Sequence, residues 1–390
     1  MDRSADVVVV GGGIVGCSAA YFLSQAGARV IVVERDALGS GASGHAPGGL
    51  GIPLSYFEPP EHAYFMRQAI NFLKWVAPRV AEESGMDILM RELPWLEVAR
   101  SEETWEYIQE WAPKTGLKVL DAQEVLSLEP RLGPPVFGGA VQEGSGQVDS
   151  YRLTLAFAKG AELRGAEVVI GEVEGLEWSG SRVTGVVTSK ETIGCDTVVL
   201  AMGAWTGQAE RWVDFPLPIG PLKGELLALK PKEDRYWPFW IMSHDTTEEG
   251  QEVPTFIHMR ADGLVHTGVT VEPDLYDNIP TEKGRKGMME RAIRLMPCIA
   301  ESELVGHVGG PRPNPPDGTT VLGPIPGREG LFIAATLPGI INSALIGQTI
   351  ADLIFQRPLP VCIDSFLPKK LAEPVKAQYG FHSYVPNRSV

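Results

Sequence analysis

The chain has 390 residues, of which 44% are hydrophobic and 21% charged, the ordinary composition of a globular protein with a sizeable core. Its 49 acidic and 34 basic side chains give a formal net charge of −15. Because nucleic acids and anionic membranes bind to basic patches, this balance argues against both as partners.

The sequence carries no pattern that predicts targeting or membrane insertion. Asp2 and Arg3 lead directly into a short apolar run, without the roughly 7–15 apolar residues of a signal peptide. No apolar run approaches the ~20 residues of a membrane span. The four cysteines are scattered, without the spacing of a metal site. We therefore expect a cytoplasmic protein with no membrane span and no metal.

The segment DVVVVGGGIVG, residues 6–16, predicts a strand, a glycine turn and the start of a helix. The β-branched run at 6–10 is typical of a strand buried on both faces of a parallel sheet. Apolar spacing predicts a helix over 14–25, and a second strand is expected at 29–33, closed by Glu34. This context favours a dinucleotide site over the alternative, a glycine turn in an unrelated βαβ unit.

Each part of this unit suits a dinucleotide. Gly11 makes the tight turn, Gly13 lets the main chain approach a pyrophosphate, and Gly16 allows the helix to pack closely on the strand. The helix start offers free N–H groups to the phosphates. Glu34, 18 residues after Gly16, is placed to accept hydrogen bonds from a ribose diol. The residues expected to bind the cofactor here are Gly11, Gly13, Ile14, Val15, Gly16 and Glu34.

Three later segments favour FAD over NAD. A small-residue loop fills 35–51, where a nicotinamide domain usually continues into a helix. A strand ending near residue 200 runs into a second small-residue stretch, 201–207. The segment 310–355 combines a proline-rich start, a strand and a helix. Such bare main chain suits an extended cofactor, and further contacts to it are expected from Arg35, Ser43, Gly48, Gly49, Val173, Ala201, Gly203, Gly339 and Ile340.

These segments, in this order, resemble the family of FAD-dependent amine oxidoreductases that includes glycine oxidase, sarcosine oxidase and D-amino-acid dehydrogenase. The resemblance runs from about residue 6 to about residue 356. It is strongest to glycine oxidase, through ASGHAPGGLG at 42–51 and GGPRPNPPDG at 309–318. Gly310 stands where sarcosine oxidase carries its flavin-linking cysteine, so the resemblance implies FAD that is held non-covalently.

The resemblance implies an α/β fold. A doubly wound Rossmann-type FAD-binding domain would be interleaved with an α+β substrate domain built on an antiparallel sheet. The apolar pattern of 61–84 predicts an amphipathic helix that Pro78 interrupts. The FAD-binding domain is expected from 1–53, 147–210 and 311–360, the substrate domain from 54–146 and 211–310, and a C-terminal tail from 361–390.

Arg312 is the first candidate for the substrate site. Pro311 and Pro313 stiffen the main chain around it. A guanidinium offers planar paired donors to a carboxylate, which every amino-acid substrate carries. The resemblance implies that this arginine anchors the substrate carboxylate, and the alternative is a structural or surface ion pair.

Further candidates are three histidines and a phenylalanine. His45 in the small-residue loop and His266 on a strand are expected as catalytic residues, and His258 and Phe256 as substrate-binding ones. Sarcosine oxidase carries a lysine near the position of His266, and glycine oxidase has a substrate-binding tyrosine where this chain has Phe256. The second difference puts glycine itself in doubt as the substrate. A lone histidine on a strand is also compatible with a structural role.

The resemblance implies the oxidation of an amino acid or an N-substituted amino acid. A hydride would pass from the α carbon to flavin N5, and the imine would be hydrolysed to a 2-oxo acid and an amine. Oxygen would reoxidise the flavin. Two alternatives stay open: a dehydrogenase that passes electrons to a quinone or a partner protein, and a flavoprotein subunit without its own amine substrate. A homo-oligomer is compatible with the sequence.

Overall fold

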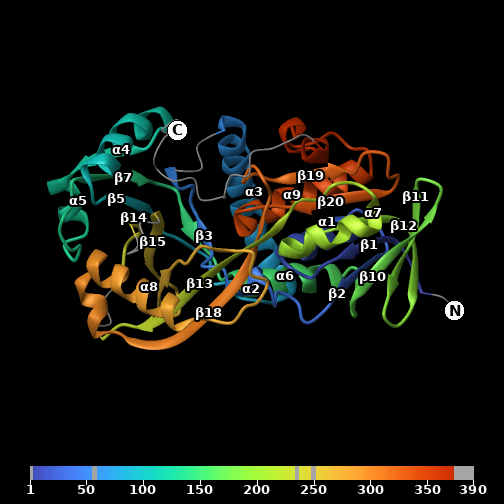
Figure 1. Cartoon of the computed structure of the whole chain (residues 1–390), viewed down its shortest axis with the longest axis horizontal. Coiled ribbons are helices and arrows are strands. Elements are labelled where there is room, and N and C mark those ends of the chain that lie inside the picture. The colour runs from blue at the N-terminus through green and yellow to red at the C-terminus, as the bar shows by residue number, and fades with distance from the viewer. Residues whose placement is uncertain (1–2, 55–58, 233–236, 247–251, 373–390) are drawn as a thin grey trace.

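The computed structural model of the chain describes residues 3–54, 59–232, 237–246 and 252–372, and Figure 1 shows how their elements are arranged. They form an eight-stranded sheet, a nine-stranded sheet and a small three-stranded one. Among the described residues, no helix is both long and apolar enough to cross a bilayer.

The eight-stranded sheet has a parallel centre. Val7 to Val10 of β1 (Ser4–Val10) pair in parallel with β2 on one side and β12 on the other, as expected for a β-branched strand buried on both faces. The other parallel strands are β2 (Val30–Glu34), β9 (Glu167–Ile170), β12 (Thr192–Leu200) and β20 (Leu331–Ala335). The antiparallel additions are β10 (Val173–Ser179), β11 (Arg182–Thr188) and β19 (Val321–Pro324).

Four helices pack together beside this sheet. Helix α1 (Ile14–Gln25) contacts α6 (Ser150–Glu162) and α9 (Gly339–Ile354), and α3 (Pro60–Ser84) contacts the same two helices. The expected interruption of α3 at Pro78 is wrong, because the helix continues through it. The apolar side of α3 is buried on its neighbours, and this packing outweighs the hydrogen bond that a proline removes.

The second sheet is antiparallel except where β14 (Trp240–Thr246) pairs with β5 (Trp95–Ala99). Its other strands are β6 (Lys118–Asp121), β7 (Gly138–Gln142), β13 (Gly220–Lys230), β15 (Glu252–Met259), β16 (Val265–Gly268), β17 (Glu272–Pro273) and β18 (Glu303–Asn314). Helices α4 (Glu102–Thr115), α5 (Ala122–Leu128) and α8 (Glu282–Leu295) lie against it. The sheet occupies the other half of the molecule in Figure 1.

Short elements complete the chain. The small sheet consists of β3 (Gly49–Leu50), β4 (Arg91–Glu92) and β8 (Gly146–Gln147). The short helices are α2 (Ala42–His45), α7 (Glu210–Val213), η2 (Gly203–Ala209), η3 (Pro297–Glu301), η4 (Asp364–Phe366) and η5 (Pro368–Ala372).

The expected fold class, a doubly wound sheet joined to an α+β part on an antiparallel sheet, is confirmed. We propose that the two large sheets mark the two domains. Strand β18 passes from 303 to 314, so it crosses the expected boundary between 310 and 311. Of the expected tail, residues 373–390 lie outside the described residues.

Candidate functional site

A cavity of about 680 Å³ is lined by residues of both large sheets. One part of its lining is the glycine turn after β1, the loop that contains α2, and the first residues of α9. The other part comes from β13, β14, β15 and β18 of the antiparallel sheet. The cavity therefore joins the expected dinucleotide site to the expected substrate site.

The glycine turn leaves no room for side chains. Gly11 has a φ of +110°, and a Cβ there would lie 2.4 Å from the carbonyl oxygen of Ala201, the residue after β12. A Cβ on Gly16 would lie 1.9 Å from the carbonyl oxygen of Gly11, so this glycine sets how closely α1 approaches β1. The turn thus presents bare main chain to the cavity.

Two helix N-termini meet the cavity and make it attractive to anions. Helix α1 begins after Gly13 and helix α9 after Pro338, and neither has a side-chain cap or an acidic residue in its first turn. The hydroxyl of Ser43 accepts the N–H of Ile14 at 3.0 Å. The Ile14 N–H is thus paired, and what the two helices offer a pyrophosphate is the positive dipole end of each at the cavity.

Glu34 lies on the edge of this turn. Its Oε2 accepts the N–H of Gly12 at 2.7 Å and its Oε1 accepts the N–H of Asp36 at 2.9 Å. The Arg35 guanidinium stacks over the ring of Trp205 at 4.5 Å, and both residues line the cavity. The bare turn, the two helix ends and the carboxylate together fit the phosphates and ribose of FAD.

The expected cofactor residues gather here. All of them except Gly16, which acts through packing, line the cavity: Gly11, Gly13, Ile14, Val15, Glu34, Arg35, Ser43, Gly48, Gly49, Val173, Ala201, Gly203, Gly339 and Ile340.

One face of the antiparallel sheet supplies the other part of the cavity. Directly paired residues of antiparallel strands share a face, and β18 pairs with β13 at Arg312 and Leu222 and at Gly310 and Gly224. The same face continues across β16 to Phe256 on β15. Arg312 and Phe256, far apart in sequence, are brought to one cavity in this way.

Arg312 is held by main-chain carbonyl groups. Its Nε donates to Leu222 at 3.0 Å, and its Nη2 donates to Lys223 at 3.2 Å and to Thr270 at 3.1 Å. These acceptors fix the plane of the guanidinium, and Arg312 places its positive charge at the cavity.

An aromatic wall defines the rest of the substrate side. The ring of Trp240 stacks on Trp95 with centroids 4.9 Å apart and tilts against Phe256 at 5.3 Å. A Cβ on Gly49 would lie 2.7 Å from the Trp240 ring, so the glycine-rich loop packs directly on this wall. Sequence analysis missed both tryptophans. The alternation of Trp240 and Met242 on one strand was the available signal, but it does not reveal which face meets the cavity.

The three candidate histidines lie in different places. His45 lines the cavity, and its Nδ1 is 2.9 Å from the carbonyl oxygen of Gly41. His258 is fully buried against Trp240, with ring centroids 3.8 Å apart, and His266 lies edge-on to it at 5.5 Å. Burial lowers the pKa of His266 to about 4 and holds that of His258 well below its ordinary value.

Neither His258 nor His266 is among the residues that line the cavity. Their part in the site stays a prediction, and the geometry favours Arg312, Phe256 and His45.

Known proteins are similar to this chain in sequence and in fold. The chain matches the family described as "DAO: FAD dependent oxidoreductase" over residues 6–353. It is 31% identical to glycine oxidase of Pseudomonas aeruginosa over 365 residues, which cover 91% of this chain and 96% of that protein. The structure of glycine oxidase from Geobacillus kaustophilus superposes with a TM-score of 0.86 at 28% identity, covering 94% and 98% of the two chains. L-proline dehydrogenase from P. horikoshii has the same fold, with a TM-score of 0.82 at 22% identity and coverage of 95% and 99%.

Proposed function

The chain belongs to the DAO family of FAD-dependent oxidoreductases and acts on CH–NH groups, and we propose that its substrate is an amino acid or N-substituted amino acid held by Arg312. The observation that carries the proposal is the guanidinium of Arg312 in the cavity, fixed by three main-chain carbonyl groups. A carboxylate is the substrate group that the positive charge of this guanidinium attracts.

When bound, FAD supplies the ring that accepts two electrons from the substrate. The part of the protein is then mainly to bind and orient. Arg312 fixes the carboxylate, and the aromatic wall of Trp95, Trp240 and Phe256 keeps water away from the rest of the substrate. With its carboxylate held, the substrate has its α carbon in one position, and this restriction supports the oxidation of the carbon that bears the amine.

The aromatic wall also supports an apolar substituent on the substrate. Phe256 is 5% exposed and Trp240 2% exposed, and both meet the cavity. Each buried methylene group contributes about 0.8 kcal/mol, or roughly fourfold in binding. We therefore expect amino acids with an apolar side chain or N-alkyl group to be better substrates than glycine.

Anaerobic flavin bleaching tests this function. The purified holoprotein should be yellow, and its visible absorbance should fall when a good substrate from a panel of amino acids and N-methyl amino acids is added. At low substrate concentration, the rate of flavin reduction should be lowest for glycine. It should rise for amino acids of the panel that carry one to three more methyl or methylene groups. A protein that cannot be reconstituted with FAD would contradict the proposal. A holoprotein that no member of the panel reduces would favour a flavoprotein subunit without its own amine substrate.

We propose oxygen as the electron acceptor, supported by the similarity to glycine oxidases. One hydrogen peroxide should form for each substrate consumed in air. If substrate reduces the flavin, and the reduced flavin is then reoxidised slowly by air but quickly by a quinone, the protein is a dehydrogenase instead.

A further inference from the structure

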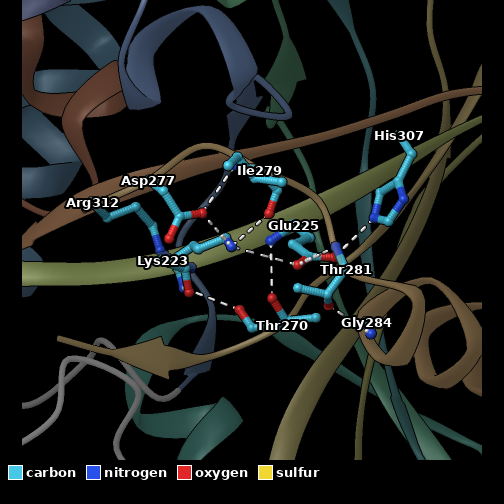
Figure 2. Close-up of polar contacts among 9 residues, drawn as sticks. All are labelled: Lys223, Glu225, Thr270, Asp277, Ile279, Thr281, Gly284, His307 and Arg312. Carbon is cyan, nitrogen blue, oxygen red and sulfur yellow. Dashed lines mark hydrogen bonds and ion pairs between the residues drawn. The ribbon is translucent and has the colours of Figure 1, made fainter. Parts of the chain in front are cut away.

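A buried charged cluster lies on the face of β13 that points away from Arg312. Strand alternation places Lys223 and Glu225 on this face, and their side chains are 2% and 0% exposed. The Lys223 Nζ is 3.9 Å from Glu225 Oε1. Figure 2 shows that polar groups surround both side chains. Burial costs each ion several kcal/mol of desolvation free energy, which close polar and charged partners must offset. The partners of Lys223 and Glu225 therefore indicate the role of this cluster.

Lys223 holds a loop. Its Nζ donates to Asp277 Oδ1 at 2.8 Å and to the carbonyl oxygen of Ile279 at 2.6 Å (Figure 2). The hydrogen bond from Lys223 also holds the pKa of Asp277 below its ordinary value. We name residues 274–281, between β17 and α8, the strap.

Glu225 holds the far end of the strap. Its Oε1 accepts the N–H of Thr281 at 3.0 Å, and its Oε2 is 2.8 Å from Nε2 of His307. Thr281 caps α8 by accepting the N–H of Gly284 at 3.0 Å. A Cβ on Gly284 would lie 2.2 Å from Glu225 Oε2, so the carboxylate fits tightly against the start of the helix. The strap is thus pinned at Asp277, Ile279 and Thr281 by side chains of a single strand.

Part of the strap lines the cavity. Tyr276, Asp277 and Asn278 line the cavity, and the Tyr276 ring lies 6.0 Å from that of Trp205. Of the pinned residues, Asp277 therefore forms part of the cavity wall, whereas Ile279 and Thr281 do not line the cavity. Of the two residues that hold them, Glu225 lines the cavity and Lys223 does not.

The same cluster is joined to Arg312. Thr270 precedes the strap, and its hydroxyl accepts the N–H of Glu225 at 3.0 Å while its carbonyl oxygen accepts Nη2 of Arg312 at 3.1 Å. The carbonyl oxygen of Lys223 also accepts Nη2 of Arg312, at 3.2 Å. Two of the three main-chain acceptors that orient the guanidinium thus belong to residues of this network.

We propose that Lys223 and Glu225 are positioning residues that hold the strap against the cavity and fix the orientation of Arg312, so that they set the affinity for carboxylate ligands. The inference rests on the proposed function only in taking Arg312 as the carboxylate anchor. The alternative is a cluster that stabilises α8 and has no effect on the cavity.

The test uses the FAD-bound full chain and benzoate as the probe, because its carboxylate suits Arg312 and its ring suits the aromatic wall. Lys223→Met should speed hydrogen exchange of 274–281 and raise the benzoate Kd, followed through flavin absorbance, by about tenfold. The flavin itself should stay bound. If Lys223 has only a structural role, Lys223→Met will lower the free energy of unfolding but leave the benzoate Kd unchanged.

Lys370→Met is the matched control. It removes a partly buried lysine from an aspartate, with Nζ 2.7 Å from Asp317 Oδ2, at residues that do not line the cavity. This variant should lose stability but keep the wild-type benzoate Kd and the wild-type exchange of the strap.

Asp277→Ala is a second variant that breaks the same ion pair. The Asp277 side chain is 42% exposed, so we expect this variant to fold. Its effect on the benzoate Kd should not add to that of Lys223→Met in the double variant, since both break one ion pair. Additive effects would overturn the proposal, as would a strap whose exchange is unchanged in Lys223→Met. Failure of every amine to reduce the flavin would contradict the proposed function alone, because benzoate binding and strap exchange need no oxidation.

Discussion

The guanidinium of Arg312 packs directly against the main chain of Gly224. A Cβ at residue 224 would lie 2.8 Å from both Cζ and Nη2 of the arginine. Gly224 faces Gly310 on the neighbouring strand, and both glycines share the cavity face with Arg312. The absence of side chains at these two positions lets the arginine fold down on the sheet and reach its carbonyl acceptors.

Gly224→Ala should therefore displace the guanidinium. We expect benzoate and substrate Kd values to rise by about tenfold, because a shifted guanidinium no longer places its charge where the carboxylate binds. Gly220→Ala on the same strand is the control, since a Cβ there meets no atom within 4 Å. Titration of the flavin spectrum measures both variants, and equal Kd values in the two would show that Arg312 does not need this contact.

Gly13→Ala should weaken FAD binding without unfolding the protein. Gly13 has an extended main chain with a φ of −75°, and the new Cβ would meet only Ser43 Oγ, at 3.1 Å. The methyl group would instead occupy space beside the helix end where a phosphate approaches. We expect a rise of at least tenfold in the FAD Kd, measured by flavin fluorescence.

Gly175→Ala serves as the comparison for that variant, because a Cβ at 175 meets nothing within 4 Å and the residue does not line the cavity. Its FAD Kd should equal that of the wild type. An unchanged FAD Kd in Gly13→Ala would place the pyrophosphate elsewhere.

Stability should fall as the pH drops from 7 to 5. Burial lowers the pKa of His266 to about 4 from 6.5, so between these values the unfolded chain binds a proton that the native protein does not. The free energy of unfolding should decrease by about 2 kcal/mol at pH 5 from this residue, with a further loss from His258, whose pKa burial also lowers. Urea unfolding at pH 7 and pH 5 measures this difference in the free energy of unfolding.

Replacing both histidines by phenylalanine should flatten this dependence, since neither position could then bind a proton on unfolding. A slope that survives the replacement would assign the pH dependence to other residues.

The dinucleotide unit could be predicted because its signals are local. A β-branched run, a glycine turn and a helical period follow each other within about thirty residues, and the glycines report the close approach of the main chain that the structure contains at Gly11 and Gly16. Arg312 could be found because two prolines and its place beside a cofactor segment marked it.

The substrate side could be predicted only in part, because it depends on strand register. Phe256 meets the cavity, while His258, two residues further along the same face, is covered by Trp240. No local pattern distinguishes these positions. The partners of Lys223 lie more than fifty residues away, and their pairing follows from how the strap returns to β13.

Carboxylate binding by Arg312→Ala tests the central claim most directly. The variant should keep its FAD and a near-normal visible spectrum, because the cofactor contacts lie mainly at the glycine turn and helix ends. Loss of a charge-assisted contact of about 1.5–3 kcal/mol should raise the benzoate Kd roughly ten- to hundredfold. It should also slow flavin reduction by substrate, and Arg312→Lys should restore binding only in part. An Arg312→Ala protein that retains its flavin, the wild-type Kd and the wild-type reduction rate would show that the carboxylate anchor lies elsewhere.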